Sequence, residues 1–93
     1  MDEEEASLSL IVQVDTVLWE VWDPIGVNHA PEARDEYTSY APEVAQMLRS
    51  GASDVEIERH LAEIILGQMG MSWVNPDRAR RTLTALRGIP IPS

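Results

Sequence analysis

Cysteine is absent from this sequence of 93 residues, which excludes every chemistry that needs a thiol. The chain can form no disulfide and no zinc–thiolate site, and it offers no cysteine nucleophile. A sequence without cysteine also fits a reducing cytoplasm. No glycine-rich phosphate loop and no serine–histidine–acid arrangement is present either. We therefore predict no cofactor and no catalytic residue.

Long apolar runs are also missing. None approaches the roughly 20 residues that a helix needs to cross a bilayer. The first residues, MDEEE, are acidic, whereas a secretory signal has a basic start followed by an apolar run. We expect a soluble, cytoplasmic protein that does not bind membranes.

Lysine is absent too, and the seven arginines leave a net charge of −9 against 16 acidic residues. Residues 1–63 hold 15 of the acidic residues and three arginines, a net charge of −12, and residues 64–93 carry +3. An anionic body repels nucleic acid and anionic lipid and attracts a basic partner. Solubility alone would also account for this charge. The last segment holds Arg78, Arg80, Arg81 and Arg87. We expect Arg78, Arg81 and Arg87 to pair with the acidic body or with acids of another subunit, rather than with nucleic acid.

Apolar residues recur at three- and four-residue spacing in several stretches, as they do along one face of a helix. The spacing predicts helices over 6–22, 31–40, 42–49, 53–69 and 76–87. Ser53 and Glu56 form a capping-box pattern, and Gly51 suits the end of the preceding helix. The sequence therefore predicts an all-α fold, a small compact bundle of four or five helices. Residues 1–93 should form one domain, with frayed tails at 1–5 and 89–93.

The connection after the first helix reads WDPIGVNHAPEARDEY, residues 22–37, which we call the corner. We expect Trp22, Ile25 and Val27 to pack into the core, and Gly26 to supply backbone geometry that a side chain would oppose. Acids in the corner should face outward, where a basic protein could bind them. The predicted partner-binding residues are Glu20, Asp23, Glu32, Asp35, Glu36, Tyr37 and Trp19. A purely structural corner is the alternative.

Three further hypotheses remain open. The same acids with His29 or His60 could hold a metal ion in a small enzyme, and Glu56, His60 and Glu63 share a helix face. An exposed strip such as Trp19 with Val12 could join two copies in a structural or regulatory homodimer. Trp73, beside Met69 and Met71, is expected to plug the open end of the bundle, or else to form an adaptable contact surface.

Several segments together resemble a known group of proteins. They are WDPIGV (22–27), PEARDEYTSYAPEV (31–44), LRSGASDVEIERHLAEI (48–64) and MGM (69–71). The chain resembles the YugE-like group of small, acidic, uncharacterised bacterial helical proteins over roughly residues 17–71. The resemblance implies a helical bundle with the corner packed between helices. Some proteins similar to this group look like immunity proteins that neutralise basic toxin or nuclease domains. The resemblance therefore also implies a non-enzymatic, antitoxin-like role.

Overall fold

A computed structural model describes residues 3–91, which form α-helices and short helical turns with no strand, so the prediction of a small all-α bundle is confirmed. The four α-helices are α1 (Glu3–Val17), α2 (Ala41–Arg49), α3 (Asp54–Glu63) and α4 (Pro76–Arg87). Two short turns extend α1 and α3, namely η1 (Leu18–Trp22) and η4 (Ile64–Gln68). Two more precede α2, namely η2 (Pro31–Ala33) and η3 (Thr38–Tyr40).

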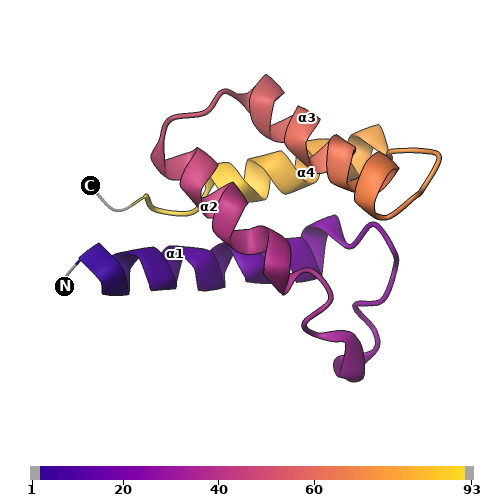
Figure 1. The fold of residues 1–93 in the computed structure, drawn as a ribbon, viewed down its shortest axis with the longest axis horizontal. Coiled ribbons are helices and arrows are strands. Elements are labelled where there is room, and N and C mark those ends of the chain that lie inside the picture. Colours follow the sequence, from indigo (N-terminus) through magenta and orange to yellow (C-terminus); the bar gives the residue numbers. More distant parts are fainter. Residues whose placement is uncertain (1–2, 92–93) are drawn as a thin grey trace.

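The helices pack around one core. Helix α1 packs against α2, and α4 packs against η1, α3 and α1. Both ends of the described chain lie on one side of the molecule, while the corner and the connection after η4 lie on the other side (Figure 1). The radius of gyration is 12.9 Å, close to the roughly 12 Å expected for a folded chain of this length. No helix within residues 3–91 has the length and apolar character that a bilayer crossing requires.

Every fourth residue of the first helical segment enters the core. Leu10, Val14, Leu18 and Trp22 are each at most 2% exposed, because residues four apart lie on one face of a helix. The segment begins earlier than predicted, since residues 3–5, expected in a frayed tail, belong to α1. Ile89, expected in the other tail, is buried. Residues 1–2 and 92–93 of the predicted tails lie outside the described residues.

The capping signals read from the sequence are confirmed. The Ser53 hydroxyl accepts a hydrogen bond from the Glu56 amide, and the Glu56 side chain accepts one from the Ser53 amide. Gly51 has φ +80°, and the amide of Ala52 donates to the carbonyl of Met47 across it. That pair of features is a Schellman ending, which glycine favours because it carries no Cβ.

The short helix predicted over 31–40 does not form. The chain instead makes successive turns in which an amide donates to the carbonyl three residues earlier. The donors are the amides of Ala33, Arg34, Glu36, Thr38 and Tyr40. Only η2 and η3 within it are regular enough to be 3₁₀ helices. A ten-residue segment gains little from helix propagation, so the tertiary contacts of Tyr37 decide its path.

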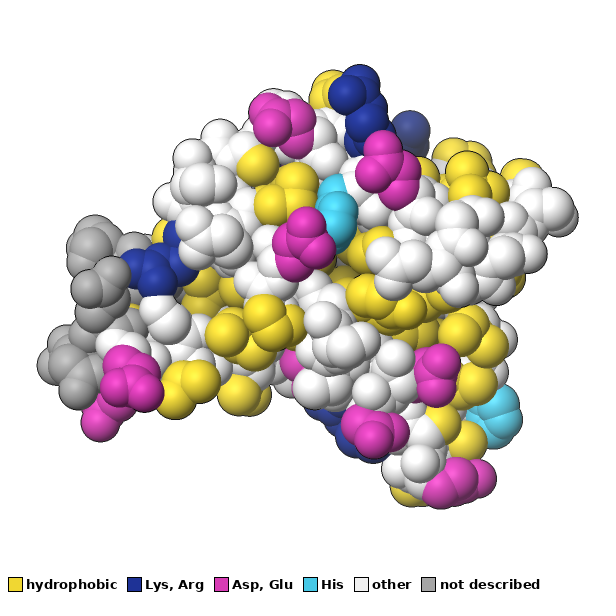
Figure 2. All heavy atoms as spheres, in the orientation of Figure 1, with side chains coloured by type: hydrophobic (Ala, Val, Ile, Leu, Met, Phe, Trp, Pro, Cys, Tyr) yellow, Lys and Arg dark blue, Asp and Glu magenta, His cyan; other side chains and the backbone are white. Residues whose placement is uncertain are grey.

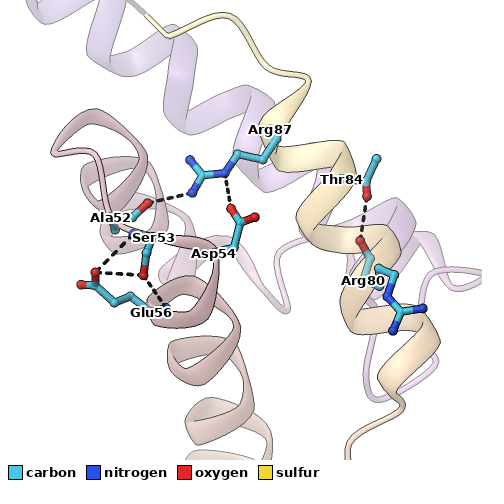
Figure 3. A network of polar contacts seen from close by, with 7 residues as sticks. All are labelled: Ala52, Ser53, Asp54, Glu56, Arg80, Thr84 and Arg87. Carbon is cyan, nitrogen blue, oxygen red and sulfur yellow. Dashed lines mark hydrogen bonds and ion pairs between the residues drawn. The ribbon is translucent and has the colours of Figure 1, made fainter.

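Arg87 fastens the end of α4 to the start of α3, as Figure 3 shows. Its Nε donates to Asp54 Oδ1 at 2.8 Å, and its Nη2 donates to the Ala52 carbonyl at 2.7 Å. The expected pairing of an arginine from this segment with the acidic body is therefore observed for Arg87. Thr82 is buried in the same helix, and its hydroxyl donates to the Arg78 carbonyl.

Candidate interaction surface

Asp23 organises the corner through its backbone and its side chain. Its amide donates to the Leu18 carbonyl at 3.0 Å, which ends the helical segment. Its φ is +26°, the only positive value at a residue other than glycine within residues 3–91. Aspartate tolerates this region better than most residues because its short side chain can bond locally. The residue before Pro24 therefore turns the chain away from the helix axis.

Asp23 is 4% exposed, and its carboxylate accepts three hydrogen bonds. The Tyr37 hydroxyl donates to it at 2.6 Å. The amides of Val27 and Asn28 donate to it at 2.9 and 3.2 Å. A buried carboxylate is stable in a protein when its oxygens are satisfied in this way. Asp23 therefore holds the loop and the tyrosine together.

Tyr37 is fully buried against tryptophan rings. Its ring lies 5.4 Å from that of Trp22 in an edge-on arrangement and 6.3 Å from that of Trp19. Its hydroxyl also accepts a hydrogen bond from the Ile25 amide at 3.2 Å. Burial, aided by the hydrogen bond to Asp23, raises the pKa of Tyr37 above its ordinary value.

The expectation that Asp23 and Tyr37 face a partner is therefore wrong, because both are enclosed by the corner itself. The expectation for Ile25 is also wrong, since that side chain is 44% exposed. Ile25 stabilises the corner through its backbone amide, which donates to the Tyr37 hydroxyl. Two other predictions for the corner are confirmed. Trp22 lies in the core, and Gly26 has a positive φ of +79°.

Four of the predicted acids remain on the surface. Glu20, Glu32, Asp35 and Glu36 are all exposed, and no ion pair within residues 3–91 holds any of them. Figure 2 shows several acidic side chains around the corner at the lower right, with arginine atoms beside them, and further acids elsewhere on this face. We call these four residues the acidic surface.

The one arginine of the corner is engaged elsewhere. Arg34 Nη1 lies 3.0 Å from Asp15 Oδ2, and its guanidinium lies 5.4 Å from the centre of the Trp19 ring. Trp19 is partly buried, between Arg34 on one side and Tyr37 on another. Arg34 therefore pairs with an acid of α1 rather than with a member of the acidic surface.

The histidines do not gather with acids into a metal site. Among residues 3–91, no three histidine, aspartate or glutamate side chains lie close enough to hold a metal ion. His60 Nε2 lies 3.7 Å from Glu43 Oε2, too far for a hydrogen bond. Glu56 is committed to the capping box, and His29 is exposed in the corner.

Trp73 is the residue that sequence reasoning placed least well. Its side chain is 66% exposed, and Met71 beside it is 36% exposed. Trp73 therefore does not plug the bundle, although Met69 does pack against the core. The path of the connection therefore brings Met69 to the core and leaves Met71 and Trp73 at the surface.

An alkaline pH should weaken the fold through Tyr37. In the unfolded chain its phenol ionises near pH 10, whereas the folded protein keeps it protonated to higher pH. The unfolded state therefore loses its proton first, and the free energy of unfolding decreases as pH rises above about 10. Urea unfolding at about pH 8 and about pH 11, followed by circular dichroism, measures this decrease.

Tyr37→Phe should remove the part of the decrease in unfolding free energy that comes from Tyr37. Tyr40→Phe is the matched control and should show the same decrease as the wild type. An equal decrease in wild type and Tyr37→Phe would contradict the assignment.

Comparisons of the chain with protein-family models, with curated proteins and with solved structures find no match. The resemblance to the YugE-like group stays a prediction.

Proposed function

We propose that this chain is a non-enzymatic acidic module that binds a basic protein, in the manner of an immunity or antitoxin-like protein covering a toxin or nuclease domain. The observation that carries the proposal is the acidic surface, whose four carboxylates are exposed without an ion pair in the described chain. Side chains left unpaired on an anionic body accelerate the encounter with a cationic protein.

The rigidity of the corner supports this proposal. Asp23 and Tyr37 hold the loop in place from within. The contacts of Arg34 with Asp15 in α1 and with Trp19 in η1 attach the far part of the loop to the first helical segment. Both ends of the loop are therefore attached to the rest of the fold. The loop includes Glu32, Asp35 and Glu36. A preorganised segment loses less conformational entropy on binding than a free loop.

The test begins with proteins captured from the native host by the wild-type chain, and then measures association kinetics with the captured protein. Raising the salt concentration from about 0.05 M to about 0.5 M should slow association by ten-fold or more, because the screening length falls to a few ångströms. Replacing Glu20, Glu32, Asp35 and Glu36 by their amides should slow association similarly at low salt.

The matched control removes the same charge elsewhere, at exposed acids outside the acidic surface. The control residues are Glu4, Glu58, Glu63 and Asp77. Association should be several-fold faster for this control than for the variant of the acidic surface. Equal slowing of both variants, or kinetics that do not respond to salt, would contradict the proposal.

The second candidate is a homodimer, and exposed apolar side chains on α1 favour it. Leu8 and Val12 are 56% and 63% exposed, and residues four apart lie on one face of the helix. Light scattering at high concentration distinguishes the two candidates, because only the homodimer requires a second copy.

A further inference from the structure

A pocket lies between the start of the corner and the start of α4, and no residue of the acidic surface lines it. Its volume is about 220 Å³. A cavity of roughly 150 Å³ is enough to hold benzene, so this pocket has room for one aromatic ring with a short chain. It opens to solvent beside Trp73 and Met71, both of which line it.

Most of the pocket wall is apolar. The lining side chains include Trp22, Ile65, Met71, Trp73 and Val74. Trp73 is the most exposed of the large apolar side chains in the described chain. A bound apolar group would remove part of this surface from water, which is favourable in proportion to the area covered.

One part of the wall is cationic. Arg78 lines the pocket and is only partly exposed. Its Nη1 donates to the backbone carbonyl of Asp23 at 3.0 Å, which orients the guanidinium without neutralising it. No carboxylate within residues 3–91 forms an ion pair with Arg78. Arg78 is therefore a half-buried cation at the pocket that no acid of the described chain neutralises.

Asn75 adds a second donor one helical turn before Arg78. Its Oδ1 accepts hydrogen bonds from the amides of Asp77 and Arg78, which identifies the other terminal atom as the NH₂ group. That group has no hydrogen-bond partner among the described residues, and Asn75 lines the same pocket. Two donors without an acidic partner favour a ligand that accepts hydrogen bonds and carries negative charge.

We propose that this pocket binds a small monocarboxylate with a compact apolar body. The apolar part lies against Trp22 and Trp73, and the carboxylate accepts hydrogen bonds from Arg78 and Asn75. The proposal is independent of the acidic surface, which has the opposite charge and uses other residues.

The probe is 3-phenylpropionate, and its matched neutral analogue is 3-phenylpropionamide. A ligand of about 11 non-hydrogen atoms with ordinary efficiency has a Kd of about 1 mM. Nuclear magnetic resonance of the three tryptophan indole N–H groups gives a built-in control, because Trp22 and Trp73 line the pocket and Trp19 does not. The acid should shift the first two signals saturably and leave the Trp19 signal in place.

The amide should bind about ten-fold more weakly than the acid. Arg78→Gln should weaken binding of the acid by a similar factor, whereas Arg80→Gln, on the same helix and outside this pocket, should leave it unchanged. Because Arg78 also holds Asp23, a second variant, Ala79→Leu, fills the pocket without touching that hydrogen bond and should abolish binding.

Three results would overturn the proposal. They are equal affinity for the acid and the amide, equal losses from Arg78→Gln and Arg80→Gln, and unchanged binding to Ala79→Leu. A titration in which no tryptophan signal shifts would overturn it as well.

Discussion

Trp22→Ala should lower the free energy of unfolding by about 4 kcal/mol, the range observed when a buried tryptophan is truncated. Trp22 is 2% exposed, and its ring packs edge-on against Tyr37 at 5.4 Å and against Tyr40 at 6.1 Å. Truncation leaves a cavity where η1, the corner and η3 meet. A loss of this size is a large fraction of the roughly 5–15 kcal/mol that stabilises a domain.

Trp73→Ala is the matched control, since it makes the same substitution at a side chain that is 66% exposed. Its cost should be within about 0.5 kcal/mol. Urea unfolding followed by far-ultraviolet circular dichroism measures both variants without relying on tryptophan fluorescence. Similar losses in the two variants would show that the assignment of core and surface tryptophans is incorrect. If Trp22→Ala does not fold, Trp22→Phe should give a smaller, measurable loss.

Asp23→Ala should cost about 3 kcal/mol, from two causes. The hydroxyl of Tyr37 and the amides of Val27 and Asn28 lose their acceptor, and a buried donor without a partner costs about 1–3 kcal/mol. Alanine at φ +26° also lacks the local side-chain hydrogen bonds that make this backbone geometry tolerable for aspartate. Asp23 stabilises the corner from inside.

Asp35→Ala is the control, because Asp35 is an exposed acid of the same corner and its loss should be within about 0.5 kcal/mol. The double variant Asp23→Ala/Tyr37→Phe should cost less than the sum of the two single variants, since each removes the same hydrogen bond. Equal stability of the Asp23→Ala and Asp35→Ala proteins would refute the role given to Asp23.

The features that sequence reasoning predicted correctly depend on neighbouring residues. Ser53 and Glu56 are three apart and cap one helix, Gly51 follows one helix end, and Trp22 continues an apolar stripe. Each rule acts within about one or two turns of chain. The all-α class follows from the sum of such local signals.

The candidate site was predicted only in part, because exposure depends on contacts between distant residues. Aspartate is almost always exposed unless it is paired, and the partner that buries Asp23 is a tyrosine 14 residues away. The signal available in the sequence was Asp23-Pro24 itself, since aspartate at a turn bonds to amides of that turn. No comparable signal in the sequence indicated that Tyr37 is buried, that Trp73 is exposed, or that Arg78 contacts Asp23.

The hydrogen bond from Arg78 to the Asp23 carbonyl joins residues 55 positions apart. The chain that closes this loop includes α2, α3 and η4, so this bond to the corner forms only when the last helix has docked. Contacts of such long sequence separation form late and slowly, since loop closure must precede them. A synthetic peptide of residues 22–37 lacks Arg78 and this bond. We therefore expect that its acids would not be held in the arrangement that they have in the folded protein.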